Sequence, residues 1–323
     1  MIQRKLRRVV RHSHRADIQH RRTEALAIIQ GYVEEKVLPG FGSTGSFNLD
    51  APSFGKKSLV YYFNLPKFPP MVIRADPLRH KMARRIAGHE ILFRLGLPAP
   101  EVMYRDLRFR TRIRWGHYFM AERRLEGVPF WEHSNPKGMI THLGEIFASL
   151  HGYTAKDTGY RGSISLHRRS NPIQFRRKVK EWLTRYRSAD CPDSEQVRAW
   201  LDHWPKDAWN MTPRLCMGDI APSNILIHGE KIHLVDLSSV KFSSALLETV
   251  KIRNKVLHDQ EELWELFFKG YMRAAEPNLR QEVEQYLNLM EGLFRIRSAG
   301  KTLKPAQRTY HCHRLFEIIQ VKS

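Results

Sequence analysis

Cysteine is scarce in this 323-residue chain: Cys191, Cys216 and Cys312 are the three, odd in number and far apart. This excludes a disulfide scaffold and favours a reducing compartment. No Cys-x-x-Cys pair occurs, so a thiolate zinc site is not expected. The chain also lacks any run of about 18 apolar residues, so no membrane-spanning helix is predicted. The N-terminus is charged but has no apolar segment of the signal-peptide kind, and we therefore expect a cytoplasmic protein.

Acidic residues are few, because 54 Lys and Arg stand against 33 Asp and Glu and give a net charge of +21. Such a charge attracts phosphate, whether in nucleic acid, in anionic lipid or in a phosphorylated substrate. Residues 1–35 form a basic N-terminal segment, which is either a solvated tail or a contact with an anionic membrane, placing the protein on the inner face of the cytoplasmic membrane. Further basic clusters lie at 105–114, 161–187 and 251–255. No zinc-finger spacing or RNA-recognition signature is present, so nucleic acid is not the expected partner.

Two lobes are predicted from the order of local patterns. In the first half, apolar and β-branched runs predict strands at 58–63, 71–74, 101–104 and 115–122. Asp76-Pro77 predicts the start of a helix that Gly96 ends. From about residue 135 helical patterns dominate. The sequence therefore predicts an α+β fold, with a small β-rich lobe at 36–126 that carries one helix and a larger, mainly helical lobe at 127–323.

The segment at 215–241 concentrates residues that can do chemistry. Asp219 is followed five positions later by Asn224 and seventeen positions later by Asp236. Two short apolar runs between Asn224 and Asp236 flank a His-Gly-Glu turn, which predicts a β-hairpin. A hairpin brings the residues at its two ends together, so these three side chains are expected to converge. Asn and Asp oxygens are ligands that Mg²⁺ prefers, and a further carboxylate could accept a hydroxyl proton, as phosphoryl transfer requires.

This segment resembles the catalytic segment of eukaryotic-like kinases. The Asp-x-x-x-x-Asn pattern, the hairpin and the Val-Asp-Leu that follows are similar to those of aminoglycoside phosphotransferases, of choline kinase-like enzymes and of bacterial lipopolysaccharide core kinases. The segments around 71–74, 89–100, 118–127 and 143–151 agree with the same order of parts. The resemblance covers roughly residues 40–275 and implies a bilobal protein kinase-like fold.

The resemblance implies a role for each matching residue. Asp219 would be the catalytic base, and Asn224 and Asp236 would bind Mg²⁺. Arg74 would contact the nucleotide phosphates, with Glu90 as its partner. The hinge between the lobes would hold the adenine ring of ATP; its residues are Met120 and Glu122.

Two glycine-rich segments compete for the loop that covers the phosphates. Gly40 to Gly45 match Gly-x-Gly-x-x-Gly, a weak signal on its own, but the last glycine lies 29 residues before Arg74. The alternative directly precedes the first of two predicted paired strands and is preferred because its spacing fits better. It consists of Gly55, Lys56, Lys57 and Ser58.

Three residues depart from the family pattern. Met217 stands where the family usually has His, Arg74 replaces the usual Lys, and Ser238 replaces the glycine after the metal-binding Asp. An arginine fork is not equivalent to an ammonium group. These departures motivate an alternative, a catalytically weak pseudokinase or a basic module that binds a membrane or nucleic acid.

The acceptor is inferred from charge. A polycationic aminoglycoside would need an acidic pocket, which fits a chain of +21 poorly. We expect ATP- and Mg²⁺-dependent phosphorylation of a sugar hydroxyl, in a lipopolysaccharide core or another anionic envelope glycolipid. Kinases of another small molecule or of protein Ser and Thr are further alternatives. His151 is expected to pack behind the catalytic loop, and the oligomeric state is left open.

Overall fold

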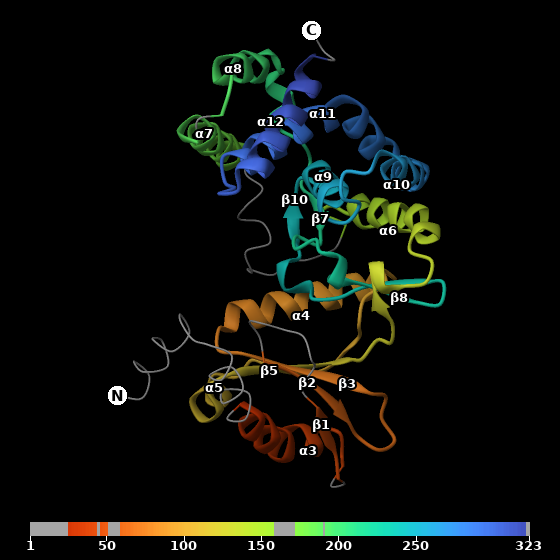
Figure 1. Cartoon of the computed structure of the whole chain (residues 1–323). Helices are drawn as coiled ribbons and strands as arrows, with labels where there is room; N and C mark the ends of the chain where they lie inside the picture. Colours follow the sequence, from red (N-terminus) through yellow and green to blue (C-terminus); the bar gives the residue numbers. More distant parts are fainter. Residues whose placement is uncertain (1–24, 44–45, 51–58, 158–171, 190, 321–323) are drawn as a thin grey trace. The chain divides into compact units, whose positions relative to one another are not determined.

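The structure is a computed structural model, and it describes residues 25–43, 46–50, 59–157, 172–189 and 191–320. The described chain divides into two compact units (Figure 1). The N-terminal unit comprises residues 1–90 and 100–125, and the C-terminal unit comprises residues 91–99 and 126–323. No helix of the described residues is both long enough and apolar enough to cross a membrane.

The N-terminal unit is built on one antiparallel sheet of five strands in the order β1-β2-β3-β5-β4. The strands are β1 (Asn48–Asp50), β2 (Leu59–Asn64), β3 (Met71–Asp76), β4 (Val102–Asp106) and β5 (Tyr118–Arg123). β3 and β5 are paired over their full length, from Met71 with Arg123 to Asp76 with Tyr118. This register places Arg74 directly opposite Met120. The four predicted strands are thus present, with small shifts at their ends.

Helices cover both faces of this sheet, which explains why nearly all of β5 is buried. Its alternate residues Tyr118 and Met120 pack with Met82 and Ile86 of α4 (Arg79–Arg94). The residues between them, Phe119 and Ala121, pack on the opposite face against a helical segment made of residues 25–32, η1 (Val33–Val37) and α3 (Leu38–Gly40).

The N-terminal unit holds more helix than the single helix that the sequence predicted. The helical segment at 25–40 and the short α5 (Phe109–Trp115) were both missed. α4 begins at Arg79, although the Asp76 carboxylate accepts a bond from the Leu78 N–H at 2.8 Å. α5 is not amphipathic in the usual way, because Phe109 and Ile113 lie on one side of the helix and Trp115 lies on the other. The sequence therefore showed no single apolar face that would indicate a helix.

The C-terminal unit is mainly helical. Its helices are α6 (Ile140–Gly152), α7 (Pro172–Ser188), α8 (Ser194–His203), α9 (Ala245–Lys255), α10 (Glu261–Ala274), α11 (Pro277–Ala299) and α12 (Pro305–Gln320). Short helical turns are η2 (Phe130–Glu132), η3 (Lys137–Met139), η4 (Lys206–Trp209), η5 (Pro222–Asn224) and η6 (Leu237–Ser239). Two small antiparallel sheets complete it: β6 (Val128–Pro129) with β8 (Ile225–His228) and β9 (Lys231–Leu234), and β7 (Arg214–Cys216) with β10 (Lys241–Ser243).

α6 and α10 approach each other closely because both carry glycine at the contact. A Cβ atom at Gly144 would lie 2.1 Å from the Phe267 carbonyl oxygen, and one at Gly270 would lie 1.9 Å from that of Thr141. The backbones therefore touch where a larger residue would hold them apart. The same pair of helices places the Nδ1 atom of His151, in α6, 2.7 Å from the hydroxyl of Tyr271, in α10.

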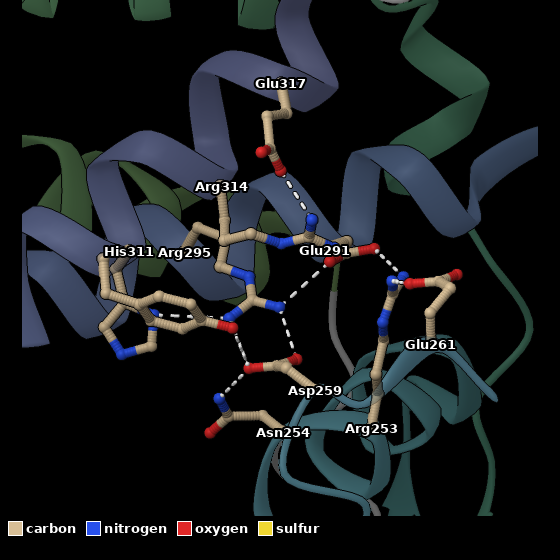
Figure 2. A network of polar contacts seen from close by, with 10 residues as sticks. Arg253, Asn254, Asp259, Glu261, Glu291, Arg295, His311, Arg314 and Glu317 are labelled. Carbon is tan, nitrogen blue, oxygen red and sulfur yellow. Dashed lines mark hydrogen bonds and ion pairs between the residues drawn. The ribbon is translucent and has the colours of Figure 1, made fainter. Parts of the chain in front are cut away.

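A buried network of charges joins α9, α10, α11 and α12 (Figure 2). The Arg295 guanidinium is fully buried and binds Asp259 at 2.7 Å and Glu291 at 3.0 Å. Glu291 also binds Arg253 of α9 at 2.9 Å. His311 of α12 places its Nδ1 atom 3.4 Å from the Arg295 guanidinium. Because every buried charge here has an opposite charge beside it, the network fixes the four helices without leaving an uncompensated ion.

Candidate functional site

A hairpin positions two of the three predicted site residues in the C-terminal unit. β8 and β9 pair from Ile225 with Leu234 to His228 with Lys231, and Gly229 in the turn has φ of +57°. This is the predicted hairpin. The Val235 N–H donates to the Asn224 carbonyl oxygen at 2.9 Å, one step beyond the last paired strand residues. Asn224 and Asp236 therefore stand at the same end of the hairpin.

Asp219 belongs to the same place in the structure. The Asn224 side-chain nitrogen donates to the Asp219 carbonyl oxygen at 3.2 Å, and this bond holds the two residues across a five-residue loop. The amide oxygen of Asn224, which is the atom a cation would take, is not used in that bond. Asp219 is exposed, whereas Asn224 and Asp236 are half-buried. The structure therefore brings Asn224 and the two aspartates to one end of the hairpin, and their amide and carboxylate oxygens are of the kind that suits Mg²⁺.

Gly218 joins the loop before Asp219 to the turn after Asp236. Its φ is +86°, and a Cβ atom there would lie 2.2 Å from the Ser239 carbonyl oxygen. Asp236 itself is in the left-handed region, with φ of +54°, and begins η6. Only glycine allows the two backbones to meet in this way. The positions of Asp219 and Asp236 are therefore coupled through backbone contact.

Glu248 of α9 holds the backbone directly before Asp219. Its two carboxylate oxygens accept hydrogen bonds from the Met217 N–H at 2.8 Å and from the Gly218 N–H at 2.7 Å. Burial raises the pKa of Glu248, but His151, Lys251 and the Gly218 N–H together outweigh that effect and keep the pKa below its usual value. An ionised carboxylate that accepts two backbone N–H groups is a strong and directional anchor. Glu248 thus fixes the position of the loop directly before Asp219.

His151 lies behind the loop, as the sequence predicted. Its Nε2 atom lies 3.2 Å from Glu248, and its Nδ1 atom lies 2.7 Å from the Tyr271 hydroxyl. Cys216 completes a buried group of three ligand types within 4.8 Å of one another. Burial raises the pKa of the Cys216 thiol well above its usual value, so the thiolate that a metal needs is disfavoured. With Glu248 already engaged by two amides, this group braces the loop and does not resemble a metal centre.

The N-terminal unit contains a second buried glutamate, which binds Arg74. The Arg74 guanidinium donates to Glu122 at 2.8 Å, and the Nε2 atom of His89 lies 3.1 Å from the other oxygen of the same carboxylate. Burial raises the pKa of Glu122, but Arg74 and then His89 outweigh that effect and lower it. Arg74 comes from β3, Glu122 from β5 and His89 from α4. Residues from two strands and one helix therefore meet at the Glu122 carboxylate, which holds the Arg74 guanidinium in place.

This arrangement corrects the predicted partner of Arg74. Glu90 is exposed on α4 and forms its ion pair with Arg105, not with Arg74. A shift of one residue along a helix turns a side chain by about 100°, so His89 faces the sheet and Glu90 faces away. Glu122, predicted as a hinge residue, is the carboxylate that Arg74 binds.

The remaining predicted nucleotide contacts have mixed outcomes. Met120 is fully buried beneath α4, so its side chain belongs to the core of the unit. Contact of Met120 or Glu122 with adenine stays a prediction. Gly55, Lys56, Lys57 and Ser58 lie outside the described residues, as do the basic residues 1–24 and two positions of the competing loop, 44–45.

Sequence reasoning missed Glu248 and His89. Each had a signal in retrospect, because each is a polar residue inside an otherwise apolar helical stretch: Ala-Leu-Leu-Glu-Thr-Val around Glu248 and Ile-Ala-Gly-His-Glu-Ile-Leu around His89. A polar group that follows the apolar face of a helix is expected to be buried with a partner. The identity of that partner could not be read from the local sequence.

Comparisons with known proteins show the family to which the chain belongs. The model of the phosphotransferase enzyme family matches residues 53–286, which include all the site residues described above. No curated protein sequence matches the chain significantly.

Solved structures show the same fold at low sequence identity. Macrolide 2'-phosphotransferase from Brachybacterium faecium is 16% identical, with 88% of this chain and 98% of that chain covered and a TM-score of 0.54. A choline/ethanolamine kinase family protein from Mesorhizobium loti is 14% identical, with 92% and 95% covered and a TM-score of 0.55. A thermostable mutant of an aminoglycoside phosphotransferase, in a ternary complex with ADP and hygromycin B, is 14% identical, with 90% and 98% covered and a TM-score of 0.51. The chain belongs to the phosphotransferase enzyme family, and it is a kinase that transfers phosphate to a hydroxyl group.

Proposed function

We propose that this kinase uses Mg²⁺ and ATP to phosphorylate a sugar hydroxyl in an anionic glycolipid of the cell envelope. The observation that carries the proposal is the junction at the end of the hairpin, where Asn224 bonds the Asp219 backbone and Asp236 follows the paired strand. A structural neighbour was crystallised with ADP, which supports a nucleotide as the phosphate donor.

Each residue has a defined role in the proposed reaction. Asp219 orients the acceptor hydroxyl and takes its proton as the oxygen attacks the γ-phosphate, while the bond from the γ-phosphorus to the bridging oxygen breaks and ADP leaves. Asn224 and Asp236 would hold Mg²⁺, which would offset the negative charge of the phosphates. Arg74, fixed by Glu122, neutralises phosphate charge. Glu248 keeps Asp219 in position through the two amides before it.

The departure at Met217 is compatible with turnover. The Met217 side chain is fully buried in the core of the C-terminal unit, and its N–H binds Glu248. Anchoring of the loop is therefore supplied by Glu248 and the backbone, so a histidine side chain at this position is not needed for it.

Surface charge supports an anionic acceptor. α7 carries six Lys and Arg residues and one acidic residue. Of the two salt bridges described for this helix, one joins Arg177 to Glu181 and the other joins Arg187 to Glu195 of α8. A surface with this surplus of positive charge attracts phosphate and carboxylate groups and repels a polycationic antibiotic. We therefore place the acceptor among anionic sugars.

The test uses purified full-length protein with Mg-ATP, with and without lipopolysaccharide core extract. Wild-type protein should bind nucleotide in a Mg²⁺-dependent manner and transfer radiolabelled γ-phosphate to the extract. Asp219→Asn should retain nucleotide binding and lose about 10³-fold in turnover, while Asp236→Asn should lose the Mg²⁺-dependent binding. Asp202→Asn, at an exposed carboxylate of α8, is the matched control and should behave as wild type.

Two results would contradict the proposal in different ways. Turnover by Asp219→Asn near the wild-type rate would remove Asp219 as the base. ATP hydrolysis without transfer of label to the extract would exclude this acceptor, although the assignment as a kinase would stand.

A further inference from the structure

The short helix α5 presents two large apolar side chains to solvent. Phe109 is 64% exposed and Ile113 is 70% exposed. They are four residues apart and so lie next to each other on one face of the helix. Thr111 and Trp115 lie on the opposite face, where Thr111 is buried and Trp115 makes an edge contact with the Tyr32 ring at 5.9 Å. The helix therefore uses its polar Thr and its Trp for packing and leaves Phe109 and Ile113 outside.

This exposure belongs to a helix that is firmly held at both ends. At its start, the buried Asp106 carboxylate accepts bonds from the Thr111 hydroxyl and the Tyr32 hydroxyl, both at 2.9 Å, and from the Arg108 N–H at 3.0 Å. At its end, Gly116 takes φ of +74° and its N–H bonds the Arg112 carbonyl oxygen at 2.8 Å. Phe109 and Ile113 are thus displayed by a fixed scaffold.

Arginines flank the two apolar side chains on both sides. The exposed ones are Arg105, Arg108, Arg110, Arg112 and Arg114. Arg108 pairs with Asp106, Arg114 with Glu35 and Arg105 with Glu90. In the part of the chain that the structure describes, no ion pair involves Arg110 or Arg112. At 100° per residue, Arg110 and Arg112 lie on either side of the stripe formed by Phe109 and Ile113.

We propose that α5 docks the protein on an anionic lipid bilayer. A bilayer offers negative headgroups to Arg110 and Arg112 and an apolar layer directly beneath them for Phe109 and Ile113. Nucleic acid offers phosphate but no apolar layer of this depth. A second copy of this chain would bring the same arginines against each other, so the charge of the patch opposes self-association. Of these three partners, the anionic bilayer matches both the exposed apolar side chains and the arginines beside them.

The inference deepens the proposed function, because it names the surface that would meet the membrane carrying a glycolipid acceptor. Binding to lipid is measured without ATP or acceptor, so failure of docking and failure of the kinase proposal are distinguishable. Full-length protein is mixed with vesicles of phosphatidylcholine alone or with phosphatidylglycerol added, and the bound fraction is measured by flotation. The wild type should float with the anionic vesicles and not with the neutral ones.

Two pairs of substitutions separate the apolar and the charged contributions. Phe109→Ser with Ile113→Ser should lower the partition onto anionic vesicles about tenfold or more. Arg110→Gln with Arg112→Gln should lower it about 30-fold at low salt and much less at high salt. The apolar control is Leu266→Ser, an exposed leucine of α10 that neighbours Glu262 and Glu265. The charge control is Lys255→Gln with Lys269→Gln, which removes the same charge from exposed positions of the C-terminal unit.

Four outcomes would overturn the proposal. Wild-type protein that does not bind anionic vesicles excludes docking. Serine variants that float as well as wild type exclude insertion of Phe109 and Ile113. If the lysine control lowers vesicle binding as much as the arginine pair does, the binding depends on the overall charge of the protein and not on α5. A loss of RNA retention by the arginine variant, with vesicle binding unchanged, would assign the patch to nucleic acid and also overturn the proposal.

Discussion

Two buried glutamates, one in each unit, have similar surroundings but bind different kinds of partner. Glu122 is 2% exposed and Glu248 is 1% exposed, and each lies close to the Nε2 atom of a fully buried histidine, at 3.1 Å from His89 and 3.2 Å from His151. The further partner of Glu122 is a side chain, the Arg74 guanidinium. The further partners of Glu248 are two backbone N–H groups.

The difference predicts how each site fails. A side-chain partner can shift on its own when its carboxylate is removed, so loss of Glu122 should change the position of one cation. A backbone partner cannot leave without moving the loop, so loss of Glu248 should move Asp219 and strain the fold. Both carboxylates have pKa values below the usual range, because the charges and N–H groups around them outweigh burial. Both are therefore ionised at neutral pH.

Among the substitutions that compare these buried groups, the largest effect is expected for Glu248→Gln. The amide keeps one acceptor oxygen but turns an NH₂ group toward a backbone N–H, which leaves a buried donor unpaired. We expect the free energy of unfolding to fall by about 3 kcal/mol, from the unpaired donor and the lost charged bonds. kcat should fall about 100-fold, because Asp219 is displaced.

Urea unfolding and steady-state kinetics measure both quantities for Glu248→Gln. The matched control is Glu265→Gln, an exposed glutamate of α10. An unfolding free energy within about 0.5 kcal/mol of wild type, the size of an ordinary surface substitution, would show that Glu248 does not anchor the loop.

A smaller effect of another kind is expected for Glu122→Gln. Arg74 would remain largely buried with a neutral partner, which should cost about 2 kcal/mol of stability. The KM for ATP should rise about tenfold through misplacement of the cation, with a smaller change in kcat. Titration with ATP at fixed acceptor measures the two separately. A fall in kcat with KM unchanged would mean that Glu122, like Glu248, acts on turnover and not on the binding of ATP. The two carboxylates would then not differ in the way proposed.

The sequence could predict what lies close along the chain. Asp219, Asn224 and Asp236 fall within one short segment, and the hairpin between the last two is set by alternating apolar residues and a glycine turn. Four strands and the long helix α4 of the N-terminal unit, and the mainly helical character of the C-terminal unit, followed from the same kind of local pattern. Local patterns were therefore sufficient to predict the hairpin between Asn224 and Asp236 and the α+β fold.

Contacts between distant elements could not be predicted in this way. His151 and Tyr271 are 120 positions apart, and His151 and Glu248 are 97 apart, so their meeting depends on how α6, α9 and α10 pack. The error at Glu90 has a different origin. Met82, Ile86 and His89 follow the helical period and mark the inward face of α4, so a stricter reading of that period would have favoured His89.

The smallest effect comes from a third charged cluster, which lies apart from the catalytic segment. His311 lies beside Arg295 and near Asp259 and Tyr310 in the network of Figure 2. Burial, followed by the Arg295 charge, lowers the pKa of His311 to about 4, while Asp259 opposes the change. The unfolded chain binds this proton with the ordinary pKa of about 6.5. Stability from His311 is therefore fully present above pH 6.5 and is lost as the pH falls from there toward 4.

This pH window sharpens the contrast with Glu122 and Glu248, whose lowered pKa values give stability that is lost only as the pH falls below the usual carboxylate range. The expected loss at His311 is about 1 kcal/mol, reduced because the ring is partly exposed. His311→Gln should flatten the fall in unfolding free energy between pH 6.5 and 4.5 relative to wild type. His203→Gln, at an exposed histidine of α8, should leave the fall unchanged. Neither glutamate titrates in this interval. If the unfolding free energy of His311→Gln falls with pH as steeply as that of wild type, another buried group causes the fall. The network of Figure 2 would then be insensitive to pH.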